Sequence, residues 1–230
     1  TMQGGGLATA ASAAAELMRT QVIPEVDACR MAKLYTAVNT YAGTNDNVKA
    51  IAKPTAANVV AKLIDACDNV SDVTGIDEGL TVYVNGALRS IIDTSSEIQL
   101  CKDINNSSPN ITRMNRSING HNLVFVPSKR MTTSVTLNDG YTNAFSDTTT
   151  TPPTVDPTKY GFTEGSTDIW FAVVAPGVAN GVTAINTLGI IPAEQSEQFD
   201  GDILKYRIYH DLIVPKQKCA AAYIAIKTSG

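Results

Sequence analysis

The stretch "ATAASAAAELMRTQVIPEVDACRMAKLYTAVNTY", residues 8–41, most constrains the fold, because it is rich in helix-forming residues. Its second half carries one apolar stripe at helical spacing, formed by Met31, Leu34, Tyr35 and Val38. A long helix is therefore predicted for the N-terminal fifth of the chain, and the remaining elements must pack against its apolar stripe.

Pro24 interrupts this stretch, because proline lacks the backbone N–H that a helix interior needs. Either the helix kinks there, or a second helix starts with Pro24 at its first position. If a second helix starts there, Glu25 and Asp27 would lie in its first turn, where negative charge interacts favourably with the helix dipole.

The next segments alternate between helix and strand. A helix is predicted over 53–70, opened by Pro54 and Thr55, and a short strand over 80–85, followed by a helix over 86–95. This succession predicts a small α/β layer.

Residues 111–137 hold two β-prone runs around Asn119-Gly120, a dipeptide that favours a tight hairpin turn. Residues 138–167 are rich in Thr, Pro, Gly and Asp and predict a long loop. A loop of that length within a domain is usually functional or mobile.

The last quarter predicts strands. "DIWFAVVAPGVANGVTAI", residues 168–185, begins with an apolar run typical of a buried strand. "DILKYRIYHDLIVPKQKCAAAYIAIK", residues 202–227, contains two β-prone runs joined by "PKQK", which predicts an antiparallel pair. The chain as a whole is expected to be α+β.

The composition indicates which classes of binding partner the chain can have. Charged residues make up 17% of the chain, below the roughly 25% of an average domain. The net charge of −4 and the pI of about 5.2 disfavour a nucleic-acid surface, which needs a basic stripe. The chain shows neither an apolar run of membrane-span length nor a signal peptide. We therefore expect protein partners in the cytoplasm, with no membrane and no specific nucleic acid.

The four cysteines are widely spaced and form no C-x-x-C pair, whereas metal and redox motifs need closely spaced cysteines. They are expected to be reduced thiols packed as small apolar side chains, namely Cys29, Cys67, Cys101 and Cys219.

The His210-Asp211 pair raises the question of catalysis. The chain lacks a G-x-S-x-G elbow, and no cysteine lies in a nucleophile motif. Adjacent strand residues point to opposite faces, so these two side chains would not meet. His121 stands alone beside the hairpin turn, and neither histidine has a ligand at short spacing. The residues therefore predict no catalytic group, no metal site and no cofactor.

Three segments carry a resemblance to a known family. "RTQVIPEVDACRMAKLY" (19–35), "INGHNLVFVPSKRMTTS" (118–134) and residues 202–227 resemble, in this order, motifs of tailed-phage major capsid proteins. The corresponding family patterns are R-x-x-V-x-P-E-x-D-A-x-R-x-x-K-L, then I-x-G-x-x-I-x-x-V-P-S-x-R-M, then a terminal pattern that includes Y-R-x-Y-H-D.

This resemblance implies the Hong Kong ninety-seven fold of phage shells. A spine helix (1–53) and terminal strands (191–230) would form the peripheral domain, with an axial domain (54–190) between them. The resemblance also implies that the matching residues are structural rather than catalytic: Pro24, Glu25, Asp27, Pro127, Arg130, Tyr206, Arg207, Tyr209, His210 and Asp211.

The function implied is that of a major capsid subunit of a tailed phage or prophage. Such a subunit assembles in the bacterial cytoplasm into the icosahedral virion shell, with further copies, scaffold and portal proteins as partners. Family members also carry an N-terminal arm and an extended loop before the spine helix. The chain starts almost at the helix, so we expect it to lack both.

A second hypothesis stays open at this point. A small α/β ligand-binding protein or enzyme, with its site near residues 138–167, would have similar composition. A concave pocket with converging titratable groups would favour that hypothesis.

Overall fold

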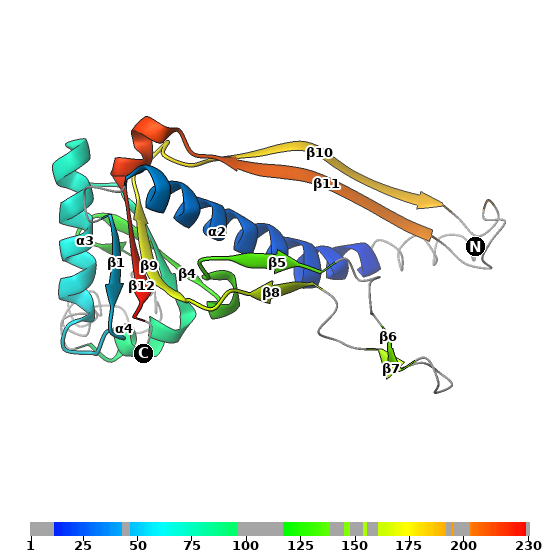
Figure 1. The fold of residues 1–230 in the computed structure, drawn as a ribbon, viewed down its shortest axis with the longest axis horizontal. Coiled ribbons are helices and arrows are strands. Elements are labelled where there is room, and N and C mark those ends of the chain that lie inside the picture. The colour runs from blue at the N-terminus through cyan, green and yellow to red at the C-terminus, as the bar shows by residue number, and fades with distance from the viewer. Residues whose placement is uncertain are drawn as a thin grey trace, which may run out of the picture.

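The computed structural model describes residues 12–42, 47–95, 117–138, 145–147, 154–155, 161–191, 195 and 203–228. These residues form an α+β fold, as the sequence predicts (Figure 1). A long helix and a two-stranded ribbon extend from a body that contains a mixed six-stranded sheet.

The predicted long helix is confirmed. It is α-helical over 12–17, passes through the π-helix η1 (Met18–Val22) and continues as α2 (Ile23–Tyr41). Pro24 occupies the first turn of α2 and cannot donate a hydrogen bond to the preceding turn, which here is the wider π-helix. The chain therefore accommodates Pro24 by local widening within one helical run. Glu25 lies in the first turn of α2, as predicted for a helix that starts at Pro24. Asp27 lies beyond the first turn, so the prediction for Asp27 was wrong.

The main sheet has the strand order β1-β12-β9-β2-β4-β3. Two neighbouring pairs, β1 with β12 and β2 with β4, are parallel, and the other pairs are antiparallel. The strands are β1 (Val48–Ile51), β2 (Thr81–Asn85), β3 (Ser117–Ile118), β4 (His121–Val126), β9 (Ile169–Val174) and β12 (Ala222–Lys227). The apolar run predicted as a buried strand is β9, and all of its residues are buried.

Helices cover both faces of this sheet. In Figure 1, α3 (Val59–Thr74) lies on one side of β1, β9 and β12, and α2 lies on the other. The helix predicted over 53–70 begins only at Val59, because a turn at residues 56–58 precedes it. The predicted helix over 86–95 forms as η2 (Gly86–Leu88) and α4 (Arg89–Asp93).

The hairpin predicted at Asn119-Gly120 is confirmed. β3 and β4 pair across it, and both turn residues have positive φ, 48° for Asn119 and 78° for Gly120. Such a turn needs residues that tolerate the left-handed region, which these two do. The turn could be predicted from the Asn-Gly dipeptide alone because both residue types adopt this conformation readily.

The predicted pairing of the two terminal strands was wrong. β11 (Ile203–Ile213) pairs with β10 (Asn180–Ile191) in a separate two-stranded ribbon, while β12 lies inside the main sheet between β1 and β9. The "PKQK" link does not form a hairpin, because Pro215 leads into the 3-10 helix η6 (Lys216–Ala221). The 3-10 helix η6 thus connects β11 in the ribbon to β12 in the main sheet.

Residues 138–167 are not one uninterrupted loop. Within the described part, β8 (Phe162–Glu164) pairs with β5 (Val135–Leu137), and β6 (Phe145–Asp147) pairs with β7 (Thr154–Val155). The rest of this predicted loop lies outside the described residues. Strands from the predicted axial and peripheral ranges share the main sheet, and the division at 53/54 and 190/191 stays a prediction.

Candidate functional site

Helix α2 brings together the three sequence segments that carry the family resemblance. At one point of the helix, Arg130 Nη1 donates a hydrogen bond of 2.9 Å to Asp27 Oδ2. Further along the helix, Lys33 Nζ donates to Asp211 Oδ1. These contacts join positions 103 and 178 residues apart in the chain, so the first segment contacts both of the others.

The second segment is shaped to present Arg130. Pro127 follows β4 and precedes the 3-10 helix η3 (Ser128–Arg130), whose turn is closed by the Arg130 N–H donating to the Pro127 carbonyl at 2.9 Å. Met131 is fully buried directly after this turn. The anchored Met131 and the tight turn together fix the direction from which Arg130 reaches α2.

The charged residues of the first segment have different surroundings. Asp27 meets Arg130, and Glu25 is half-buried near the start of α2, where burial raises the pKa of its carboxyl. Arg30 packs over the ribbon: a Cβ at Gly181 would lie 3.2 Å from the guanidinium carbon of Arg30. Glycine at position 181 therefore leaves room for the Arg30 guanidinium against the ribbon backbone.

The third segment lies along β11. Tyr206 donates to Asn186 Oδ1 at 3.0 Å across the ribbon, and the Arg207 guanidinium lies 5.9 Å from the centre of the Tyr209 ring. The hydrogen bond from Lys33 lowers the pKa of Asp211. These contacts hold the ribbon together and tie it to α2.

His210 is half-buried on the ribbon. Burial lowers the pKa of its imidazole, and the positive charge of Arg30 acts in the same direction. Its Nδ1 is buried and has no hydrogen-bond partner within the described structure. Asp211 lies on the opposite face of β11 and bonds to Lys33, so the two side chains do not form the hydrogen-bonded pair that a catalytic triad needs.

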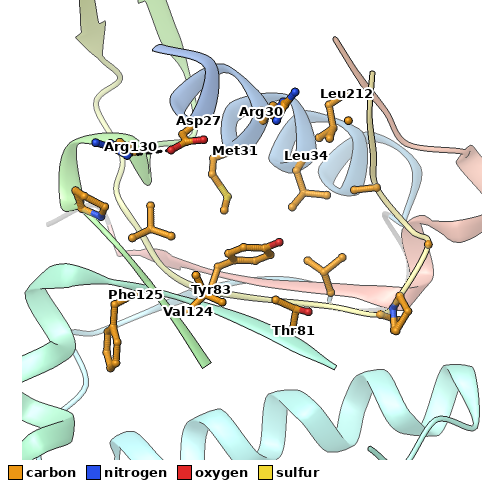
Figure 2. A pocket seen from close by; sticks show the side chains of 18 residues that line it. Asp27, Arg30, Met31, Leu34, Thr81, Tyr83, Val124, Phe125, Arg130 and Leu212 are labelled. Carbon is orange, nitrogen blue, oxygen red and sulfur yellow. Dashed lines mark hydrogen bonds and ion pairs between the residues drawn. The ribbon is translucent and has the colours of Figure 1, made fainter. Parts of the chain in front are cut away.

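A cavity of about 510 Å³ lies between α2 and the main sheet. Figure 2 shows Met31 and Leu34 pointing from α2 toward Tyr83 and Val124 on the sheet, with the Asp27–Arg130 pair at one end. The walls are mainly apolar. Sequence reasoning did not predict this cavity, because its lining comes from segments that are distant in the chain. It is also distinct in sequence from the 138–167 range, where the second hypothesis placed a site.

Two of the remaining candidate groups, His121 and Cys67, line the same small pocket beside α3. His121 is 4% exposed in β4, and its Nδ1 has no partner within the described part of the chain. Burial raises the pKa of Cys67 to about 12, which keeps its thiol protonated. Cys29, Cys67 and Cys219 are free, and Cys101 lies outside the described residues.

The described residues hold no group of three or more His, Cys, Asp or Glu side chains placed to bind a metal ion. Their helices are all too short or too polar to span a bilayer.

Comparisons with known proteins give one likeness. No protein-family model matches the chain, and no curated protein matches it. A solved structure from Mycobacterium phage Che8 resembles the fold with a TM-score of 0.47 at 13% sequence identity. The match covers 79% of this chain and 54% of that chain, so this chain spans about half the length of the structure it resembles. We infer no function from this likeness.

The Asp27–Arg130 pair should contribute measurably to stability. Its side chains are 40% and 24% exposed, so solvent screens part of the attraction. We expect Arg130→Met to lower the free energy of unfolding by about 1 kcal/mol in urea denaturation. Arg19→Met is the matched control, because Arg19 pairs with Glu16 in full solvent and should show no measurable change. Equal losses in the two variants would contradict the proposed joining role of Arg130.

Proposed function

We propose that this chain is a structural protein, the major capsid subunit of a tailed phage or prophage, which self-associates into an icosahedral shell around the genome. The observation that carries the proposal is the meeting of the three resembling segments on α2. Residues that match the family motifs make the contacts there, Asp27 with Arg130 and the Asp211 carboxylate with Lys33. A chance likeness in three separate segments would not be expected to select residues that touch.

The shape of the molecule supports self-association. Helix α2 and the β10–β11 ribbon extend from the sheet body (Figure 1). Large apolar side chains on the ribbon are exposed by 40–55% and have no cover within the described structure: Val182, Ile185, Leu188, Tyr209 and Ile213. Exposed apolar groups gathered on one element are typical of a surface that contacts other proteins.

Shell stability in this proposal comes from many moderate contacts. A standard interface buries roughly 1,600 Å² in total, and a subunit that contacts several neighbours gains further from multivalency. Partners are further copies of the chain, with scaffold or portal proteins, in the host cytoplasm during assembly and in the virion afterwards. In this proposal His210 and Asp211 hold the ribbon on α2 and carry no reaction.

Expression of the reading frame that contains this chain tests the proposal. We expect particles of capsid size in sedimentation and negative-stain microscopy, with peptides of this chain as their main component by mass spectrometry. Replacing Ile185 with aspartate should leave the circular dichroism spectrum unchanged and reduce particle yield, because a charge on the exposed apolar ribbon opposes burial against a neighbour. Failure of the whole reading frame to form any assembly larger than a dimer would refute the capsid function.

A further inference from the structure

The cavity between α2 and the main sheet has the size and lining of a small-molecule site. Its volume of about 510 Å³ lies within the roughly 300–1,000 Å³ typical of such sites. Figure 2 shows the side chains of Met31, Leu34, Tyr83 and Val124 around the open space. Because most of the wall is apolar, an occupant needs an apolar body to contact it.

The charged residues of the cavity favour an anionic occupant. Among the described lining residues, the charged side chains are two arginines and one aspartate, which leaves one positive charge in excess. Asp27 and Arg130 neutralise each other at one end of the cavity, where their nitrogen and oxygen atoms are 2.9 Å apart. The excess positive charge is therefore that of Arg30.

Arg30 lies where the ribbon meets α2, and it lacks an acceptor there. Arg30, Gly181 and Leu212 all line the cavity, and Gly181 stands opposite Leu212 in the ribbon. The Arg30 Nε is buried and has no hydrogen-bond partner within the described structure. His210 lies on the same ribbon face as Leu212, and its Nδ1 is likewise buried without a partner there. A buried donor without an acceptor costs free energy, more so when it is charged, and a bound anion would recover that cost.

We propose that this cavity binds a single-chain amphipathic carboxylate, with its carboxylate on the Arg30 guanidinium and its acyl chain between Met31, Leu34 and the sheet. A guanidinium can donate two parallel hydrogen bonds to a carboxylate, and such charge-assisted pairs are stronger than neutral ones. Inorganic phosphate has the charge but no group that contacts the apolar wall. The site lies apart from the exposed face of the ribbon, so this inference does not rest on the proposed capsid function.

Isothermal titration calorimetry with decanoate tests the proposal. At about pH 7.5 the carboxyl group is ionised, and we expect saturable binding at one site per chain. Decylamine carries the same chain with a positive head, and it should bind at least about 10-fold more weakly because Arg30 repels it. Absence of saturable decanoate binding, or equal affinity for decylamine, would overturn the proposal.

Two variants test the head and the chain of the ligand separately. Arg30→Met keeps an apolar stem without the charge, and it should weaken decanoate binding at least about 10-fold. Arg19→Met is the matched control, because Arg19 pairs with Glu16 in solvent and does not line the cavity. Met31→Trp should fill the cavity and abolish binding, with thermal melts confirming that each variant is folded. A folded Arg30→Met variant that binds decanoate as tightly as Arg19→Met would contradict the proposed site.

Two other occupants of the cavity would give different results. If a second copy filled it, the protein would self-associate in sedimentation, and Met31→Trp would disrupt that association. If the acyl chain came from a bilayer, the protein would float with phosphatidylglycerol vesicles, and Arg30→Met would prevent flotation. Either result would overturn the assignment to a free carboxylate. Particle formation by the whole reading frame tests the capsid function separately, so the two proposals can fail independently.

Discussion

Replacing Phe171 with alanine is expected to lower the free energy of unfolding by about 3–5 kcal/mol. Phe171 is 1% exposed in β9, between β12 and β2 in the main sheet. Its ring stacks on Tyr223 with the centroids 6.3 Å apart, and Val84 stands opposite it on β2. Removing the ring leaves a cavity beside two strands and α3, which cannot all move inward together. The loss would be measured by urea or guanidinium denaturation.

Val73→Ala is the matched control for Phe171→Ala. Val73 lies in α3 and is 52% exposed, so its truncation creates no cavity. A surface change of this kind normally shifts stability by less than about 0.5 kcal/mol. Comparable losses at the two positions would mean that β9 is not the centre of the core.

Strands were predictable from the sequence, but their partners were only partly so. The alternating exposure of β11 and the burial of Ala222, Tyr223, Ile224 and Ala225 in β12 follow from their different patterns. A fully buried run indicates an interior strand with neighbours on both sides. Applied to residues 219–227, this rule argues against pairing with an exposed, alternating strand, and it explains the error in the predicted terminal pair.

The candidate site shows the same division between local and long-range information. The Asn119-Gly120 turn depends on two adjacent residues and was predicted correctly. The Asp27–Arg130 contact joins positions 103 residues apart, and spacing alone cannot predict it. Only the resemblance to the family motifs singled out both Asp27 and Arg130 as structural residues. The cavity under α2 had no sequence signal, because no single segment contributes enough of its lining to show a pattern.

Asn85→Ala is expected to lower the free energy of unfolding by about 2–4 kcal/mol, because one buried amide satisfies three separate groups. Asn85 is 1% exposed at the end of β2. Its Nδ2 donates to the Ile169 carbonyl at 2.9 Å, and its Oδ1 accepts from the Ala87 N–H at 2.9 Å and from Ser128 Oγ at 2.7 Å. The side chain thus joins β2, β9 and the turn that carries Arg130. Alanine leaves all three partners without their bond, and water has least access to the Ile169 carbonyl, because Ile169 is 1% exposed whereas Ala87 and Ser128 lie at the surface.

Asn69→Ala is the matched control, because it removes an amide side chain that is exposed rather than buried. Asn69 makes a hydrogen bond of similar length, 2.7 Å from its Nδ2 to the Asp65 carbonyl, but on the exposed face of α3. Water can replace this bond, and alanine has the higher helix propensity, so we expect little or no loss in the same denaturation experiment. Because Asn85 also fixes Ser128 in η3, its variant should additionally reduce the effect of Arg130→Met, which chemical denaturation of the double variant would measure. Strict additivity of the two changes would show that the turn presents Arg130 to α2 without help from Asn85.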